Sequence, residues 1–277
     1  MGLVAGAVGL VIGWRVVETA MFDYVSTAHA TMVTPDQVDL VAVPEWLGES
    51  VQYHISSIVS EQVSPDPLDG KSLHRAVRAL ELEPWVQRID QVQRLRNGRI
   101  EVHAAYRKPV AVVAGRAGYH LVGDMAVRLP GLYVRNQVRH LGLPVIAGVS
   151  SAPPQVGQVW PGQDLRAGLG LIELLVREPY VDQILVFDVG HRDERGRVRP
   201  VLHTERGRIH WGFPPGQERS IEPDALTKRR RLRQIAAIKN GRIDAGGQIV
   251  SIYGPVIQTQ PLNLEAEVAP SSYTFDR

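Results

Sequence analysis

Residues 80–124 read LELEPWVQRIDQVQRLRNGRIEVHAAYRKPVAVVAGRAGYHLVGD. Asn97-Gly98 stands between two runs of β-forming residues, and both central positions of a type I′ hairpin turn need the positive φ that these residues tolerate. Such a turn places Leu95 opposite Ile100. The stretch therefore predicts a β-hairpin, and the rest of the chain is interpreted around it.

The second strand of this hairpin has the clearer pattern. Apolar and polar side chains alternate along it, which is the period of a strand with one buried face; the apolar positions are Ile100, Val102, Ala104 and Tyr106. The first strand fits less well, because the same register sets Gln93 opposite Val102 on the apolar face. Only a β-bulge or a shifted register removes this conflict. The sequence thus predicts the hairpin and leaves its register open.

Upstream of the hairpin, the pattern predicts one strand and two helices. Val38–Val43 has the composition of a short strand that ends at Pro44. Apolar residues then recur at helical spacing over Glu45–Ser60, and again from Ser72, an expected N-cap, to Pro84, which stops the second helix. The order strand, helix, helix, strand, strand is typical of an α+β unit in which two helices cover one face of a small sheet.

Residues 113–262 predict a second domain built mainly of antiparallel strands, with two or three helices. The expected strands are Ile184–Val189, Val198–His203, Arg208–Trp211 and Ile249–Gln258, and the expected helices are Asp164–Arg177 and Pro223–Lys239. The last residues, 263–277, include an Ala-Pro-Ser-Ser stretch and are expected to be disordered. The expected fold class is therefore α+β throughout.

A set of short motifs follows this order of elements. Pro84 and Trp85 come after Leu80 at the expected helix end, and Arg107 and Pro109 close the hairpin; Val86, Ile100, Val102, Val110 and Ala111 complete the pattern. Further on come Tyr119-His-Leu-Val122 with Asp124, and then Leu143–Gly148. This succession, from Val38 to Gln258, resembles the FtsQ/DivIB family of bacterial cell-division proteins. The resemblance implies a POTRA domain at 34–112 and an FtsQ-like β domain at 113–262.

The same resemblance implies a non-catalytic scaffold of the divisome at the septum. The implied partners are FtsB-like and FtsL-like single-pass coiled-coil proteins, with the POTRA domain helping recruitment near the membrane. We expect a partner to add a strand to an exposed sheet edge. We assign this edge to the last β run, at Ile249, Ser251, Tyr253 and Val256, since the intervening Pro255 has no N–H to donate and fits an edge. The alternative is that Tyr253 fills the core.

The first residues, 1–25, are interpreted as part of a membrane anchor. Gly2–Trp14 is an apolar run without charge. As a helix it covers roughly 20 Å, against about 30 Å of hydrocarbon in a bilayer. We therefore expect a single-pass inner-membrane protein whose anchor extends upstream of Met1 and whose bulk is extracytoplasmic. The alternatives are a buried N-terminal helix and a cleaved signal peptide.

Composition excludes several classes of site. The 277 residues include 31 basic and 29 acidic residues and no cysteine. The balanced charge gives no reason to expect nucleic acid, and the lack of cysteine excludes disulfides, thiolate catalysis and Cys-ligated zinc. One local exception is the basic run Lys228–Arg233. We interpret it as a solvated helix face, the alternative being contact with anionic lipid or an acidic partner.

Other candidates for chemistry do not assemble from the sequence. His191, Asp193, His203 and His210 are close along the chain, but no His-x-His or His-x-x-x-His pair accompanies them. No Gly-x-Ser-x-Gly, Ser-x-x-Lys or Walker motif occurs. We therefore predict no metal, cofactor, small-molecule substrate or enzyme activity. Two alternatives stay open: a POTRA-containing transport or secretion-associated chaperone module, and a hydrolase-like protein whose cleft joins His203, His210 and a carboxylate.

Overall fold

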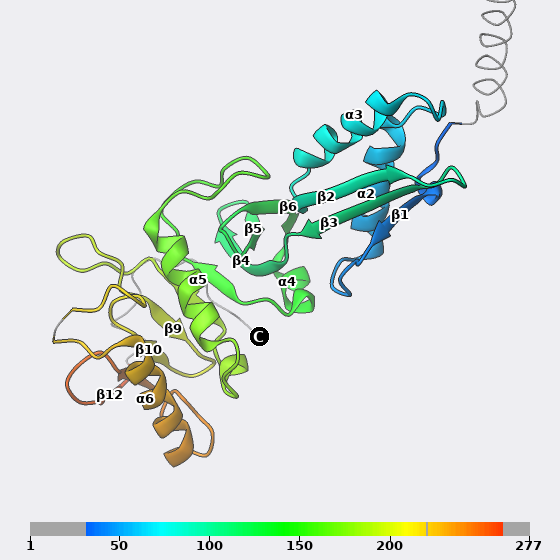
Figure 1. The fold of residues 1–277 in the computed structure, drawn as a ribbon. Helices are drawn as coiled ribbons and strands as arrows, with labels where there is room; N and C mark the ends of the chain where they lie inside the picture. Colours follow the sequence, from blue (N-terminus) through cyan, green and yellow to red (C-terminus); the bar gives the residue numbers. More distant parts are fainter. Residues whose placement is uncertain (1–31, 220, 263–277) are drawn as a thin grey trace, which may run out of the picture. The chain divides into compact units, whose positions relative to one another are not determined.

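The computed structural model describes residues 32–219 and 221–262, and Figure 1 shows its ribbon. The expected anchor at 1–25 and the expected disordered tail at 263–277 lie outside the described residues. Within the described ranges, helices are all too short or too polar to cross a membrane.

The chain divides into two compact units, Met1–Lys108 and Pro109–Arg277. The sequence suggests a boundary at 112/113. Strand β4 (Pro109–Gly115) nevertheless belongs to the sheet of the second unit from its first residue. Each unit is described separately.

The first unit has the strand-helix-helix-strand-strand order that the sequence predicts. After a 3-10 turn, η1 (Pro35–Gln37), the elements are β1 (Val38–Val41), α2 (Glu49–Gln62), α3 (Gly70–Glu81), β2 (Val86–Arg94) and β3 (Ile100–Tyr106). The three strands form one sheet in the order β1-β3-β2, with β1 parallel and β2 antiparallel to β3. The α+β class is therefore confirmed for this unit.

One face of this small sheet packs against both helices. The alternation along β3 buries Ile100 and Val102, and these side chains share a core with Ile55 of α2 and Leu80 of α3. The polar side chains that alternate with them lie on the opposite face, where Arg99 Nε donates to Asp39 at 2.6 Å. The period of two thus separates a dry face from a wet one.

The hairpin turn differs from the expected type I′. Gly98 has φ +84°, whereas Asn97 is not among the described residues with positive φ. The amide of Gly98 donates to Leu95 O at 3.0 Å, and the amide of Leu95 donates to Arg99 O at 2.8 Å. The loop therefore has three residues, a type I turn followed by a left-handed glycine.

This longer loop shifts the pairing of β2 with β3 by one residue. Val92 lies opposite Val102, and Gln93 lies opposite Glu101. The register predicted from a two-residue turn is wrong, and the conflict over Gln93 disappears with it. Two further irregularities interrupt β2, between Val86 and Arg88 and between Ile89 and Gln91.

The helix starts also differ from the sequence prediction. Ser72 does not cap α3, because the N-cap is Asp69 and Ser72 is buried inside the first turn, where its Oγ donates to Asp69 O at 2.6 Å. Helix α2 begins at Glu49 rather than Glu45, after a turn in which Leu47 N donates to Pro44 O at 3.0 Å.

The second unit is built on one nine-stranded sheet. After β4 come β5 (Gly118–Gly123), β6 (Arg128–Tyr133), β7 (Val145–Ala147), β8 (Val186–Asp188), β9 (Val201–His203), β10 (Arg208–His210), β11 (Gln248–Ser251) and β12 (Gln258–Pro261). Their spatial order is β12-β11-β10-β9-β8-β7-β4-β5-β6. The pairs β4-β7, β7-β8 and β10-β11 are parallel and the other pairs are antiparallel, so the sheet is mixed.

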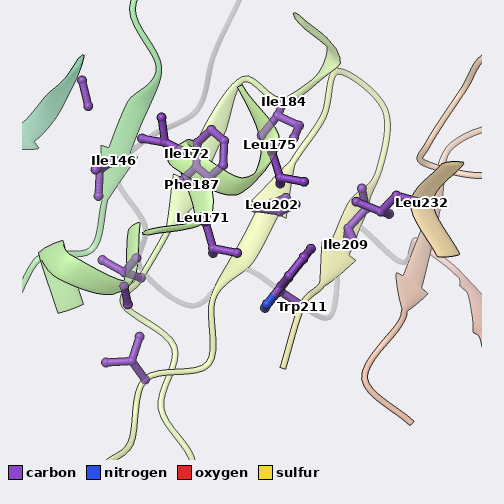
Figure 2. Close-up of a cluster of buried hydrophobic side chains, with 14 of the residues drawn as sticks. Ile146, Leu171, Ile172, Leu175, Ile184, Phe187, Leu202, Ile209, Trp211 and Leu232 are labelled. Carbon is purple, nitrogen blue, oxygen red and sulfur yellow. The ribbon is translucent and has the colours of Figure 1, made fainter. Parts of the chain in front are cut away.

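Two of the helices in this unit share the core of the sheet. They are α5 (Gln163–Leu175) and α6 (Ala225–Ile238), while α4 (Arg135–Leu141) follows β6 and the 3-10 turn η2 (Val181–Gln183) precedes β8. A row of residues paired across five strands faces them: Ile146, Phe187, Leu202, Ile209 and Val250. Figure 2 shows Leu171 and Leu175 of α5 beside Phe187 and Leu202, with Leu232 of α6 beside Ile209.

The last predicted strand is in fact two strands. The run expected at Ile249–Gln258 is a strand only at Ile249–Ser251, in β11, and at Gln258, the first residue of β12; the two strands pair antiparallel. The split falls where Gly254 and Pro255 occur, residues that interrupt a strand by flexibility and by the missing N–H.

Candidate functional site

Strand β12 forms one edge of the nine-stranded sheet. In the part of the chain that the structure describes, it pairs with β11 alone, and all four of its residues are exposed. One side of an edge strand presents backbone N–H and C=O groups without a strand partner. Gln258 and Gln260 lie on one face, opposite Ser251 and Ile249 of β11, while Thr259 lies on the face of the buried Val250.

The residues that the sequence assigns to the edge lie one strand inward or in a connection. Ile249 and Ser251 are on β11, which pairs with β10 on one side and β12 on the other. Tyr253 and Val256 lie between the two strands. The guanidinium carbon of Arg199 lies 4.4 Å from the ring centre of Tyr253, and Val256 is 62% exposed. The predicted edge position is therefore corrected from β11 to β12.

Arg231 of α6 holds the connection between β11 and β12. Its Nη1 donates to Ile252 O at 2.7 Å and to Gly254 O at 2.6 Å, and its Nη2 donates to Pro255 O at 2.8 Å. A charged donor strengthens each of these bonds. One guanidinium thus ties the helix to three carbonyl groups of the connection ahead of the edge strand.

Lys228, at the start of the basic run, is fully buried. Its Nζ lies 2.6 Å from Glu222 Oε1 and donates to Phe213 O at 3.0 Å. Burial lowers the pKa of Lys228, because it disfavours the charged form, and the Glu222 carboxylate acts against this effect. The prediction of a solvated face is wrong at this residue.

The other end of the run binds Glu178, which follows α5. Arg233 Nε and Nη2 donate to the two carboxylate oxygens of Glu178, each at 2.7 Å, and Arg229 Nε lies 3.5 Å from the same carboxylate. The Arg233 hydrogen bond lowers the pKa of Glu178 and outweighs burial, which acts in the opposite direction. Arg230 is exposed and donates to Thr227 at 3.1 Å. The side chains of the run therefore attach α6 to other residues of the second unit.

The residues of the expected POTRA signature fall into both units. In the first unit, the backbone amide of Arg107 donates to Trp85 O at 2.9 Å. The Arg107 side chain donates from Nη1 to Pro84 O at 2.9 Å and to Val86 O. Trp85 packs against the core of this unit. Pro109 begins β4 in the second unit.

The first unit has a surface groove beside β1, the edge strand of its sheet. Its volume is about 480 Å³, and it is lined by Pro35, Asp36, Val38, Asp39, Leu40, Glu49, Gln52, Tyr53 and Ser56. The carboxylates of Asp36 and Glu49 make the groove acidic, while that of Asp39 is paired with Arg99. Tyr53 is 66% exposed there.

A cluster of Asp188, His191 and His203 lies near the middle of the large sheet. The Oδ2 atom of Asp188 is 3.4 Å from Nε2 of each histidine. Burial alone would raise the pKa of Asp188, but the two histidine side chains and a hydrogen bond from the amide of Gly190 outweigh it, so the pKa lies well below its usual value. The sequence pointed to the two histidines but grouped them with Asp193 in place of Asp188.

The other members of the suspected metal set lie elsewhere. Asp193 binds Arg197, whose Nε donates to it at 2.7 Å, and this hydrogen bond lowers the pKa of Asp193 to about 2. His210 is on β10, where it pairs with Val201, and it is not part of the described cluster. His210 lies on the same face of the sheet as Asp188, because both pair with Val201, but it does not join this cluster.

Comparison with protein-family models and with curated proteins finds no match for this chain.

Proposed function

We propose that this chain is a non-catalytic scaffold of the bacterial divisome, similar to FtsQ/DivIB, that recruits and links partner proteins at the septum. In this proposal, residues 1–25 contribute to an inner-membrane anchor and both units are extracytoplasmic. The first unit acts as the POTRA domain, and the second acts as the partner-binding β domain.

The open edge at β12 is the observation that carries this proposal. An incoming strand can continue the sheet by main-chain hydrogen bonds, which provide affinity with little dependence on side chains. Specificity then comes from alternate side chains, Gln258 and Gln260 on one face and Thr259 on the other. Pro261 has no N–H and limits the register that a partner strand can adopt.

The hydrogen bonds of Arg231 to the connection between β11 and β12 support the same function. A strand that binds a partner loses less conformational entropy if it is already ordered. Arg231 binds three carbonyl groups of the connection that leads to β12, so in this proposal α6 helps to order the edge before a partner binds. In this proposal, the basic run contributes to partner docking by ordering the connection before β12, and not by contact with lipid.

The proposed partners are FtsB-like and FtsL-like single-pass proteins, on the resemblance alone. We assign the added strand to the FtsB-like protein. The acidic groove beside β1 offers the first unit a separate surface for recruitment near the membrane.

The proposal is tested by copurification of the full chain with an FtsB-like partner. Neighbouring residues of a strand direct their N–H groups to opposite sides, so one of Thr259→Pro and Gln260→Pro removes a donor on the open side and the other removes one that faces β11. We expect one variant to lose partner binding while keeping the thermal transition of the wild type. Tyr253→Lys, outside β12, should bind nearly as well as the wild type.

Partner binding that survives both proline substitutions would contradict the edge assignment. Arg230→Ala is the matched control, because Arg230 is an exposed residue of the same unit whose side chain reaches only Thr227 among the contacts described.

A further inference from the structure

Three side chains from the centre of the large sheet converge on one point. Asp188 is the last residue of β8, His191 follows it in the next loop, and His203 is the last residue of β9. Their potential ligand atoms all lie within 4.8 Å of one another. Asp188 and His203 share one face of the sheet, the face opposite the Phe187 row, because Asp188 pairs with Val201 two residues before His203.

Two of the three separations match those of ligands around a tetrahedral zinc ion. Zinc bonds of about 2.0–2.1 Å place two ligand atoms of a tetrahedron roughly 3.4 Å apart. Nε2 of His191 and Nε2 of His203 are each 3.4 Å from Oδ2 of Asp188. We propose that Asp188, His191 and His203 bind a divalent zinc-like transition-metal ion.

The donor set determines the class of ion. Two imidazole nitrogens with one carboxylate oxygen suit Zn²⁺, whereas Mg²⁺ and Ca²⁺ prefer sites made of oxygen atoms. Three protein ligands also leave a fourth coordination position of a tetrahedral ion for water or for a side chain of a partner.

The surroundings orient these ligands. The amide of Gly190 donates to Oδ1 of Asp188 at 2.8 Å, so the other oxygen, Oδ2, is the one directed at the histidines. A Cβ atom on Gly148 would lie 2.6 Å from Oδ1, which shows how closely backbone encloses that oxygen. A fixed second oxygen of this kind is the usual support of a metal-bound carboxylate.

The His203 ring also points to a missing partner. Its Nε2 is buried and makes no hydrogen bond of normal geometry to any residue in the described ranges, although Asp188 is 3.4 Å away. A buried polar nitrogen without a hydrogen bond costs free energy. Coordination to a metal ion through this atom would remove the cost.

An ion at this point would join the loop after β8 to strands β8 and β9. This proposal does not depend on the proposed divisome function. The site lies three strands from β12 in the order β12-β11-β10-β9, so metal binding and partner binding can be measured separately.

The test is a calorimetric titration of the metal-free full chain with Zn²⁺, carried out without a histidine affinity tag. We expect about one ion per chain. His191→Ala and His203→Gln should each lower the affinity by about tenfold or more. His191 is half exposed, so its substitution should leave the fold intact even if that of His203 does not. Co²⁺ in place of Zn²⁺ should give the strong visible absorption of a tetrahedral site.

His140→Ala is the matched control, because His140 is an exposed histidine on α4 of the same unit, outside the cluster. It should bind Zn²⁺ as tightly as the wild type. Absence of saturable binding, or equal affinity in the wild type and the His191→Ala variant, would overturn the proposal and leave the cluster as an ion-pair network.

Discussion

Arg231 donates from Nη1 to the main-chain oxygen of Ile252 at 2.7 Å, which joins α6 to the residue that follows β11. Ile252 is itself fully buried in the core that α6 shares with the sheet. The guanidinium therefore binds the carbonyl group of a residue that is fixed in the core, and it also binds the carbonyl groups of Gly254 and Pro255 in the connection. Arg231 therefore holds the connection from which β12 begins.

Arg231→Ala should loosen the connection and the edge strand. The change removes three charge-assisted hydrogen bonds, and we expect a loss of about 1–3 kcal/mol in the free energy of unfolding. Hydrogen exchange followed by mass spectrometry should show faster exchange over residues 252–261. Arg230→Ala should leave that exchange unchanged. Equal exchange in the two variants would show that Arg231 does not order the connection.

Lys228→Met should destabilise the second unit strongly. It leaves the Glu222 carboxylate, whose side chain is 7% exposed, without its cation, and breaking a buried pair costs about 3–5 kcal/mol. The double variant Lys228→Met, Glu222→Gln should recover part of this loss because no buried charge remains. Urea unfolding of both variants measures the difference. A double variant as unstable as the sum of its single changes would contradict a coupled pair.

Acid should weaken the contact between Glu178 and Arg233. The pKa of Glu178 is lower in the folded chain than its usual value, so the ionised carboxylate contributes stability above the unfolded pKa of about 4.3, and this stability is lost as the pH falls through the folded pKa. Glu178→Gln should lower the free energy of unfolding by about 1–2 kcal/mol at pH 7, since Arg233 is half exposed.

Thermal unfolding of the wild type and Glu178→Gln across pH 3–7 tests this expectation. The two stabilities should converge below about pH 4. A difference that grows on acidification would have the wrong sign.

Arg107→Ala should destabilise the first unit by about 1–2 kcal/mol, because it removes the side-chain donor to the carbonyl groups of Pro84 and Val86. Hydrogen exchange in β2 and β3 should accelerate. Arg88→Ala, which removes only an exposed pair with Asp90, provides the comparison and should change little. Equal effects of the two substitutions would deny Arg107 this role.

Local patterns predict the first unit well where one signal dominates. The alternation along Ile100–Tyr106 identifies both faces of β3, because successive side chains of a strand point to opposite faces of the sheet. The register fails because it depends on the conformation of the turn: of Asn97 and Gly98, only Gly98 has a positive φ. The resulting three-residue loop moves the pairs of residues 91–94 by one residue.

The candidate site was less predictable because its decisive contacts are tertiary. The pattern of Lys228–Arg233 predicts a solvated run, but Glu222, shortly before it in the chain, and the more distant Glu178 bind its side chains. The sequence predicts that Asp188 ends a strand. Its neighbours along the chain do not indicate that Nε2 of His203, on the next strand, lies 3.4 Å from its Oδ2 atom. The edge is misplaced by one strand because β11 and β12 form a single β-rich run in the sequence.

The account of β12 as a docking edge is tested most directly by site-specific crosslinking. The chain has no cysteine, so single cysteines at Gln258, Thr259 and Gln260 give unique attachment points for a short photocrosslinker, with Leu132→Cys on the opposite sheet edge as the control. We predict crosslinks to the FtsB-like partner at all three β12 positions and none at Leu132. Crosslinking at Leu132 alone, or at none of the four positions while the partner copurifies, would contradict the account.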